Sequence, residues 1–218
     1  IGEEDRHPYD RVGLTSFFAG ASADDLTLSR ETFDDDERVR FVRGDAVARL
    51  DRAARRVTTT RGVSIGYDIL VLATGSYAAR LTVDGFDLPG CFVYRTLDDV
   101  EGLETFVRRR AEELGRPLRG TVIGGGLLGL EAAGAMQSLG IACTVVQSSE
   151  RLMSAQLDSR GADALRRLIE ARGIAVRTGS VTTRLDPDAR GFVRGLEFRE
   201  GDYAETDVVI FTVGVRPR

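Results

Sequence analysis

Lysine is absent from this chain of 218 residues, so every basic side chain other than that of His7 is arginine. The arginines are spread along the chain, form no basic block, and are outnumbered by acidic residues, which gives a formal net charge of −4. Proteins that bind nucleic acid usually carry a concentrated basic patch. We therefore do not expect a nucleic-acid-binding protein, and we expect His7 to be a loop residue.

Cysteine is scarce as well. Cys91 and Cys143 are the two residues of this type, they lie far apart in the sequence, and no CxxC pair occurs. Zinc sites, iron-sulfur clusters and redox-active dithiols need closely spaced cysteines or clusters of metal ligands. We expect none of these sites within this chain and expect both cysteines to be structural.

Long apolar runs are also missing. No run has the length that a membrane-spanning helix needs, and no signal peptide leads the chain, so a cytoplasmic protein is the expectation. The length and an apolar content of 42% suit one large or two small domains with a real core. The chain opens on Ile1-Gly2 without methionine, and we expect a piece of a longer protein.

The most informative stretch spans residues 121–136. A short β-branched run leads into Gly124-Gly125-Gly126-Leu127-Leu128-Gly129 and then into residues that predict a helix. This order of strand, glycine turn and helix is typical of a dinucleotide-binding βαβ unit. Gly124 allows a tight turn, Gly126 lets the backbone approach a pyrophosphate, and Gly129 lets the helix pack on the strand. Free N–H groups at the helix start bind the phosphates.

The flanks of the glycine motif fit the same unit. A second strand is predicted at residues 142–146, after the helix and Gly140. Gln147 lies 23 positions after Gly124, where a ribose-binding residue is expected. A glycine turn without a ligand is the alternative, and the flanking strands and helix argue against it.

Periodicity and capping residues predict the other elements. Helices are expected near residues 24–33, at 158–172, and at 96–114, where Thr96 caps the helix and Gly115 ends it. Residues 67–76 form a continuous apolar run ending in Thr-Gly-Ser, as expected for a buried parallel strand with a ligand-binding turn. Further strands are predicted at 39–42, 46–50, 56–60, 174–176, 181–185, 193–198 and 207–213, with turns at 51–54 and 186–188.

These elements predict an α/β fold with two Rossmann-like dinucleotide-binding domains and short antiparallel crossover strands. Residues 97–213 are expected to form a complete small dinucleotide domain. Residues 1–96 are expected to be an incomplete part of another, and 214–218 the start of a return to it.

Six stretches together resemble one known family: EEDRHPYDRVGLTSFF, YDILVLATGSY, CFVYRT, VIGGGLLGLEAAGAMQSLGI, ERLMSAQLD and VIFTVGVRPR. They are similar to the FAD/NAD(P)-binding region of the large subunit of assimilatory NAD(P)H nitrite reductase, one of the pyridine nucleotide flavoprotein reductases with two dinucleotide domains. The resemblance covers essentially the whole chain. It implies that residues 1–96 belong to an FAD-binding domain and that 97–213 form an NAD(P)-binding domain.

The resemblance implies a set of flavin contacts. Glu3 and Glu4 match an acidic strand end that accepts hydrogen bonds from the adenosine ribose of FAD, and Arg11 matches an arginine beside the FAD pyrophosphate. The other matching positions are Val47 at the adenine, Thr74, Gly75 and Ser76 in the turn under the flavin, and Arg95 near the isoalloxazine.

The resemblance also implies the contacts of NAD(P)H. Its pyrophosphate is expected on a group of turn and helix residues, namely Gly124, Gly126, Leu127, Leu128 and Gly129. Glu131, expected on the first helical turn, matches a carboxylate beside the nicotinamide, and Gly214 matches a glycine that lines the nicotinamide site. Without the resemblance, the alternative interpretation of Glu131 is an acid that is favoured near a helix N-terminus.

Two positions depart from the family pattern. Many relatives have a lysine five residues after the arginine that matches Arg11, whereas this chain has Ser16 there, which favours the nitrite-reductase branch over ferredoxin and rubredoxin reductases. Gln147 replaces the glutamate of NADH-using relatives, and glutamine does not repel a 2′-phosphate. Such a phosphate could be met by nearby donors, Ser148, Ser149 and Arg151, so NADH and NADPH both stay open.

The implied reaction is hydride transfer from NAD(P)H to FAD, in which the cofactors carry the chemistry and the protein positions them. No catalytic side chain and no metal ligand is predicted. In a full nitrite reductase, electrons pass on through iron-sulfur and siroheme centres, whose cysteines this chain lacks. The alternatives are a free-standing electron-transfer reductase for nitrate reductase, ferredoxin or rubredoxin, and a non-catalytic dinucleotide-binding module. A homodimer is compatible with each.

Overall fold

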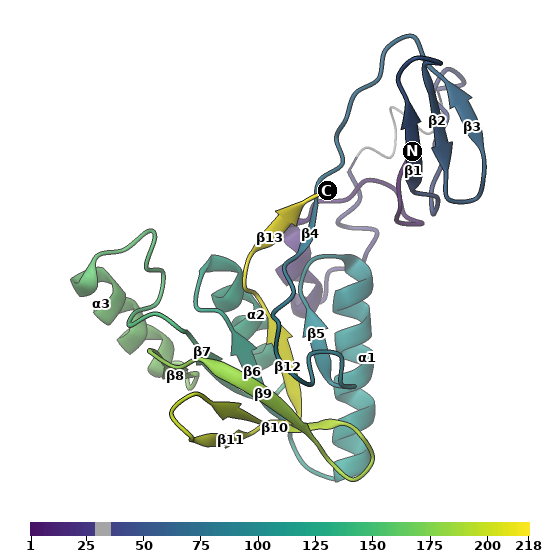
Figure 1. Ribbon diagram of the computed structural model, residues 1–218. Helices are drawn as coiled ribbons and strands as arrows, with labels where there is room; N and C mark the ends of the chain where they lie inside the picture. The colour runs from purple at the N-terminus through teal and green to yellow at the C-terminus, as the bar shows by residue number, and fades with distance from the viewer. Residues whose placement is uncertain (29–35) are drawn as a thin grey trace. The chain divides into compact units, whose positions relative to one another are not determined.

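The computed structural model describes residues 1–28 and 36–218, and the chain divides into two compact units (Figure 1). The first unit comprises Ile1–Gly13 and Ala21–Gly75, and the second comprises Leu14–Gly20 and Ser76–Arg218. These bounds differ from the expected division after residue 96, because β5 (Cys91–Val93) is a strand of the second unit's parallel sheet. The assignment of the units to FAD and NAD(P) stays a prediction.

The first unit contains an antiparallel sheet in the order β1-β2-β3, with bounds Val47–Asp51, Arg56–Thr59 and Ser64–Gly66. The strands predicted at residues 46–50 and 56–60 are confirmed. The turn between them is closed by Ala54 N, which donates to Asp51 Oδ1 at 2.9 Å. Val57 and Thr59 on β2 are buried, as alternate residues of a strand with one covered face should be.

The apolar run predicted as a buried strand does not form one. Ile69, Val71 and Leu72 are 86%, 80% and 68% exposed, and residues 67–75 pair with no strand in the described part of the chain. A parallel strand is stabilised by hydrogen bonds to neighbours on its edges, so apolar residues alone do not create it. Ser76 instead begins β4 (Ser76–Ala78), which pairs antiparallel with β13 (Val215–Pro217) in the second unit.

Two further predictions differ in the first unit. Residues 39–42 form no strand, and their described backbone bonds are a local one from Val39 N to Asp36 O and one that Val42 O accepts from Gly2 N. Of the helix predicted near residues 24–33, the described part, 24–28, consists of turns and an isolated bridge. The rest of that prediction lies outside the described residues.

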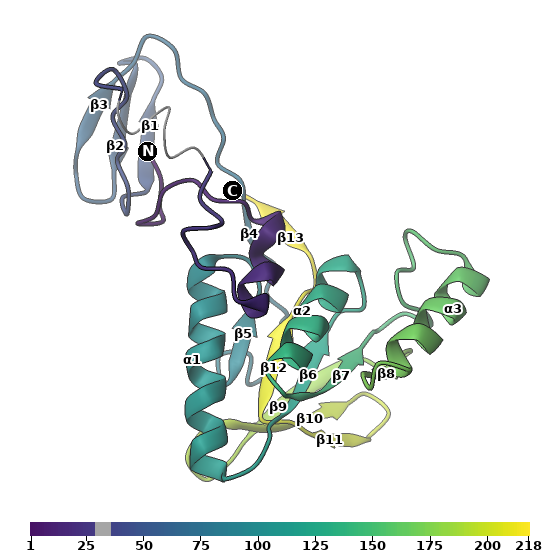
Figure 2. The same ribbon diagram turned by 180° about the vertical axis from the view of Figure 1, so that it is seen from behind.

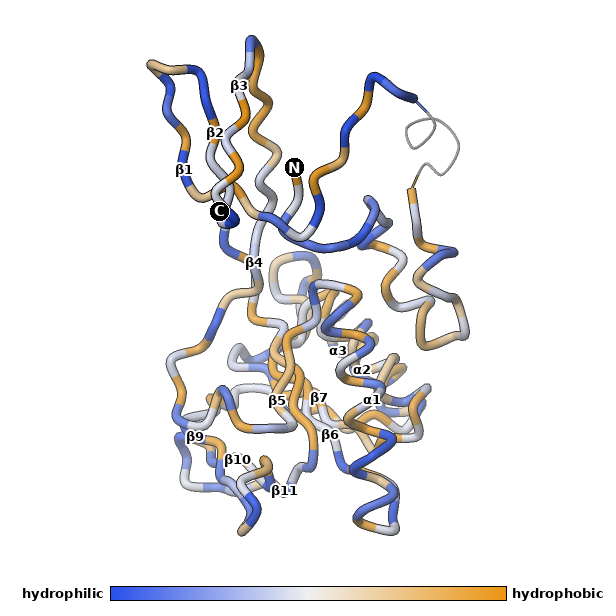
Figure 3. Tube along the Cα trace, turned by 90° about the vertical axis from the view of Figure 1, so that its right-hand side faces the viewer, coloured by the Kyte–Doolittle hydropathy of each residue, from blue (hydrophilic) through white to orange (hydrophobic). Residues whose placement is uncertain are grey.

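The second unit is built on a parallel five-stranded sheet in the order β5-β12-β6-β7-β8. Besides β5, its strands are Val208–Phe211 (β12), Arg119–Ile123 (β6), Ala142–Val146 (β7) and Ala175–Arg177 (β8). All of β12 and most of β6 are buried, as expected when both faces of a parallel sheet are covered. Figure 3 shows hydrophobic residues in the middle of this unit, where β5, β6 and β7 are labelled. The strands predicted at residues 142–146, 174–176 and 207–213 are confirmed as β7, β8 and β12, and the β-branched run before the glycine turn is confirmed as part of β6.

Helices cover one face of the parallel sheet, and an antiparallel sheet covers the other (Figures 1 and 2). The helices are α1 (Leu97–Leu114) and α2 (Leu127–Ser138), while α3 (Ser159–Glu170) packs along β8. The antiparallel sheet has the order β11-β10-β9, with bounds Tyr203–Glu205, Val193–Phe198 and Thr182–Pro187. A short 3-10 helix, η1 (Val12–Ala19), brings Phe18 to stack on Tyr94.

Helix α1 begins and ends where its capping residues predict. Thr96 Oγ1 accepts a hydrogen bond from Asp99 N, and Asp99 accepts one from Thr96 N, which is a complete capping box. Gly115 ends the helix in the left-handed conformation, with φ 62°. The burial of Arg110 was not expected. Its side chain lies on the apolar side of the helix and stacks on Phe192.

The antiparallel sheet closes the core through large apolar side chains. Leu185, Val193, Leu196 and Phe198 pack with Phe211 and other residues of the parallel sheet. The turn between β9 and β10 lies at residues 188–191 and not at 186–188, because Asp186 and Pro187 still pair with β10. Asp188 Oδ1 accepts the N–H groups of Arg190 and Phe192 and closes this turn.

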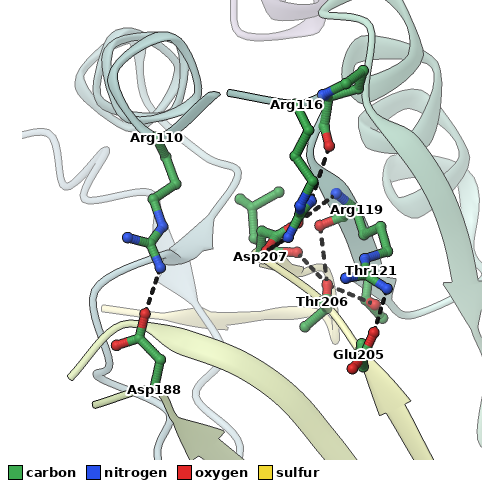
Figure 4. Close-up of polar contacts among 10 residues, drawn as sticks. Arg110, Arg116, Arg119, Thr121, Asp188, Glu205, Thr206 and Asp207 are labelled. Carbon is green, nitrogen blue, oxygen red and sulfur yellow. Dashed lines mark hydrogen bonds and ion pairs between the residues drawn. The ribbon is translucent and has the colours of Figure 1, made fainter. Parts of the chain in front are cut away.

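A polar network joins the amino ends of β6 and β12 (Figure 4). The buried carboxylate of Asp207 accepts two hydrogen bonds from the Arg116 guanidinium, at 2.8 and 2.9 Å, and one from Arg119 N at 2.8 Å. Burial alone would raise the pKa of Asp207, but these bonds and the arginine charges lower it. Beside it, the buried hydroxyls of Thr121 and Thr206 share a hydrogen bond of 3.1 Å.

The lowered pKa of Asp207 predicts a loss of stability in acid. A carboxylate whose pKa is depressed by folding stabilises the protein above its unfolded pKa of about 3.9, and the stabilisation fades as the pH falls through the folded value. Asp207→Asn should lower the free energy of unfolding by about 2 kcal/mol at pH 7, and this deficit should shrink below about pH 4. Urea unfolding at a series of pH values measures it.

The control for this prediction is Glu205→Gln. Glu205 pairs with Arg119 at the same end of the sheet, but the Glu205 side chain is 62% exposed, and exposed pairs contribute little, about 0 to 1 kcal/mol. Equal losses from the two variants would contradict the role assigned to Asp207.

Candidate dinucleotide site

The site lies where β6, β7 and β12 end. From β6 the chain proceeds through β7 to β8 on one side, while β12 and β5 lie on the other side of β6. The chain therefore adds strands on one side of β6 first and on the other side later, so a switch point lies between β6 and β12. Ligands of open α/β sheets bind at such a switch point, outside the carboxyl ends of the strands. Gly124 follows β6, Gln147 follows β7 and Thr212 follows β12.

Glycines make the turn after β6 tight enough for helix α2 to pack against it. Gly124 has φ 118°, and a Cβ on it would lie 2.5 Å from Thr212 O. A Cβ on Gly129 would lie 1.8 Å from Gly124 O, so no larger residue fits without moving the helix. A Cβ on Gly126 would meet nothing within 4 Å. Gly126 therefore faces open space at the start of the helix.

The N-terminus of α2 offers unshared backbone donors. Gly126 is its N-cap and provides no side-chain capping bond, and the first turn carries no acidic residue. The first N–H groups of a helix have no intrahelical acceptor and carry partial positive charge. The N–H groups of Leu127, Leu128 and Gly129 are therefore suited to an anion such as a pyrophosphate. Glu131 lies one turn further along the helix than the sequence suggested.

Gln147 is held inside the protein at both ends of its amide. Its Oε1 accepts a hydrogen bond from Gly125 N at 2.6 Å, and its Nε2 donates to Ser149 Oγ at 2.6 Å. Ser149 Oγ in turn donates to Arg151 O at 3.0 Å. Gln147 thus fastens the glycine turn to the end of β7, a role that the sequence did not suggest.

A cavity of about 660 Å³ opens between these strand ends. Its lining combines the glycine turn with the ends of β7 and β12 and with segments of chain near β4 and β9: Leu81, Thr82, Val83, Ile123, Gly124, Gly126, Val146, Gln147, Ser148, Ser180, Val181, Thr182, Thr183, Arg199, Thr212 and Val213. No carboxylate belongs to this lining, which suits a ligand that carries phosphate groups.

The sequence analysis missed most of the lining residues, among them Thr212, Thr182 and Arg199. Thr212 donates its hydroxyl to Ile123 O and Gly124 O, both at 3.1 Å, and it was detectable as the residue after the buried strand β12. Thr182 and Arg199 come from the antiparallel sheet, and no motif marks them. The Thr182 hydroxyl is buried and has no hydrogen-bond partner among the described residues.

The flavin positions that fall in the first unit are partly engaged with one another. Tyr9 OH donates to Glu4 Oε2 at 2.6 Å, and Arg11 pairs with Glu4 and stacks on the Tyr9 ring. The other positions predicted in this unit are exposed: Glu3, Val47, Thr74 and Gly75. Their contacts with FAD stay predictions.

The flavin and nicotinamide positions of the second unit are also placed. Arg95 Nη2 donates to Ser76 Oγ at 2.8 Å, which brings these two residues together. Gly214 has φ 105°, and its carbonyl accepts a hydrogen bond from Ala79 N at 2.9 Å. Arg151 does not line the cavity, and its guanidinium makes a long contact of 3.5 Å with Ser154 O.

The two thiols have no active-site character. Burial, helped at Cys91 by the charge of Asp87, raises the pKa of each thiol to about 12. Cys91 and Cys143 are free and lie on β5 and β7, which are separated by two other strands of the sheet. A thiol with such a pKa is not a nucleophile near neutral pH.

Two features of the described residues bear on the class of site. Within residues 1–28 and 36–218, His, Cys, Asp and Glu side chains form no group of three or more that could bind a metal ion. None of the described helices combines the length and the apolar character needed to cross a membrane.

Comparisons with known proteins agree with this geometry. A family model described as pyridine nucleotide-disulphide oxidoreductase matches residues 1–218. The chain is 38% identical over 216 residues to the nitrite reductase (NADH) large subunit of Escherichia coli (strain K12), covering 99% of this chain and 25% of that protein. It is 43% identical over 216 residues to the nitrite reductase [NAD(P)H] large subunit of Klebsiella oxytoca, covering 99% and 22%.

A solved structure shows the same fold. The crystal structure of a ferredoxin reductase from Rhodopseudomonas palustris matches with a TM-score of 0.86 and 27% identity, over 99% of this chain and 52% of that one. The resemblance inferred from the sequence is confirmed. The chain spans about a quarter of the length of the two nitrite reductase subunits.

The packing of the glycine turn predicts opposite effects for two alanine substitutions in α2. Gly129→Ala should destabilise the protein by about 3 kcal/mol, because the new methyl group overlaps Gly124 O. Gly134→Ala is the control, since a Cβ there meets nothing within 4 Å, and it should stabilise the helix by about 0.5 to 1 kcal/mol. Thermal unfolding of both variants tests this, and similar changes in the two would contradict the packing.

The raised thiol pKa values predict slow alkylation. At pH 8, Cys91 and Cys143 should react with iodoacetamide far more slowly in the native protein than in urea, because burial and protonation both oppose thiolate formation. Mass spectrometry of timed samples measures the reaction. Rapid labelling of either residue in the native protein would contradict the assignment.

Proposed function

This chain belongs to the pyridine nucleotide-disulphide oxidoreductase family, and we propose on that premise that it passes hydride and electrons from NAD(P)H through FAD to a redox partner. The observation that carries the proposal is the uncapped N-terminus of α2, which faces open space at Gly126 beside a cavity without carboxylates. A pyrophosphate requires this combination of backbone donors, close approach and absence of negative charge.

The proposal gives the residues of the second unit binding and positioning roles. The N–H groups of Leu127, Leu128 and Gly129 bind the pyrophosphate, and Gly126 lets it approach the backbone. Gln147 holds the turn in place through Gly125 N. Glu131 and Gly214 are proposed at the nicotinamide end. NAD(P)H and FAD supply the hydride chemistry when they are bound.

Electron transfer through a protein disulfide is not part of this proposal. The family description includes disulphide reduction, but Cys91, which is half-buried, and Cys143, which is buried, are free and lie on strands that are not adjacent. We therefore propose that electrons leave through FAD to a separate acceptor.

The specific form of the proposal is the diaphorase part of an assimilatory nitrite reductase. Its support is the identity of 38% and 43% to two nitrite reductase large subunits over 99% of the chain. The acceptor is then an iron-sulfur and siroheme module, and the first unit contributes the FAD contacts through Glu3, Glu4, Arg11 and Val47, with Thr74 and Gly75. A cytoplasmic location and a homodimer belong to the same proposal.

A second form is a free-standing reductase that serves ferredoxin. Its support is the ferredoxin reductase that shares this fold at 27% identity. Reduction of added ferredoxin, measured against reduction of nitrite, distinguishes the two forms.

The proposal predicts the absorption spectrum of the purified protein supplied with FAD. A flavin band should appear and should bleach on anaerobic addition of NADH or NADPH. A flavin band that neither nucleotide bleaches would indicate a binding module that does not catalyse hydride transfer, and this result would contradict the proposal.

Gly126→Ala tests the site itself. The new methyl group projects into the space where the pyrophosphate meets the helix, so the affinity for NAD(P)H should fall about tenfold or more, which corresponds to about 1.4 kcal/mol. The matched control is Gly134→Ala in the same helix, which should bind like the unmodified protein. Nucleotide titration followed by protein fluorescence gives both affinities.

A further inference from the structure

Among the described residues, one charged side chain lines the cavity at the carboxyl ends of β6, β7 and β12, that of Arg199. Arg199 follows β10 directly and was not marked by any motif. Its side chain is exposed, and its guanidinium makes no hydrogen bond or ion pair with any of the described residues. The cavity therefore has a cation that is not neutralised by the protein.

The position of Arg199 is set by backbone hydrogen bonds that lead to the end of β7. Arg199 N donates to Val181 O at 2.9 Å. Ser180, the residue before Val181, donates its N–H to Gln147 O at 3.1 Å. Arg199 thus lies on the side of the cavity where the chain leaves β7. In a dinucleotide fold, the residue after this strand faces the adenosine ribose.

Negative charge is missing from the same side. Gln147 is neutral, and both ends of its amide are occupied by Gly125 N and Ser149 Oγ. The acidic side chain of Glu150 lies against Gly179, and neither Glu150 nor Glu200, which follows Arg199 in the chain, lines the cavity. Residues that carry hydroxyl groups, among them Ser148 and Thr183, belong to the lining.

We infer that Arg199 recognises the 2′-phosphate of NADPH, so that this protein prefers NADPH to NADH. A planar guanidinium binds a phosphate dianion through two charge-assisted hydrogen bonds, and no carboxylate of the cavity opposes the phosphate. The inference rests on the proposed function, because it takes the cavity to be the dinucleotide site.

The test is calorimetric titration of the purified protein with NADP⁺ and with NAD⁺, and with 2′,5′-ADP and 5′-AMP as probes of the 2′-phosphate alone. NADP⁺ should bind about tenfold or more tightly than NAD⁺, and 2′,5′-ADP more tightly than 5′-AMP. Arg199→Ala should abolish the preference and leave the affinity for NAD⁺ unchanged. Gln147→Glu should weaken the binding of NADP⁺ while NAD⁺ still binds.

The matched control is Arg194→Ala. Arg194 is an exposed arginine on the same strand, β10, but it does not line the cavity, so its removal should leave the ratio of affinities unchanged. Tighter binding of NAD⁺, an unaltered ratio in Arg199→Ala, or the same loss in Arg194→Ala overturns the inference and leaves the proposed function standing. Failure of both dinucleotides to bind overturns the proposed function and the inference with it.

Discussion

The close approach of α2 to the turn after β6 is the constraint on which the second unit depends. Gly129 lies so near Gly124 O that a side chain at position 129 has no room, and a Cβ on Gly124 would lie 2.5 Å from Thr212 O. Thr212 then donates its hydroxyl to the carbonyls of Ile123 and Gly124. The end of β6, the start of α2 and the end of β12 therefore form one tight assembly. Gly124 and Gly126, which belong to this assembly, line the cavity.

The amino ends and the carboxyl ends of the parallel strands have different roles. At the amino ends of β6 and β12, charges and hydroxyls are paired with one another, as in the contacts of Asp207 with Arg116 and of Thr206 with Thr121. At the carboxyl ends, α2 begins at Gly126 without a side-chain capping bond and a cavity opens. Satisfied polar groups stabilise the amino ends, and the start of the helix makes the carboxyl ends suited to bind an anion.

The chemistry available to this chain follows from what its side chains do not supply. Cys143 is buried and Cys91 is half-buried, burial raises the pKa of both thiols, and among the described residues neither a carboxylate nor a cysteine lines the cavity. Thiols with such pKa values are poor nucleophiles near neutral pH. This agrees with membership of a family whose reactions run on bound cofactors.

The sequence by itself determined the features that depend on residues close together in the chain. Thr96 and Gly115 set the ends of α1, the glycine spacing set the turn and α2, and the apolar run at 142–146 is the strand β7. The same reading failed for residues 67–75, because a strand also needs neighbours that hydrogen-bond to it. Only the tertiary structure decided that Gln147 turns its amide to Gly125 and Ser149, that Arg110 is buried beneath Phe192, and that Arg199 reaches the cavity. Each of these depends on segments that are far apart in the chain or on the direction of a side chain, and local periodicity carries no information about either.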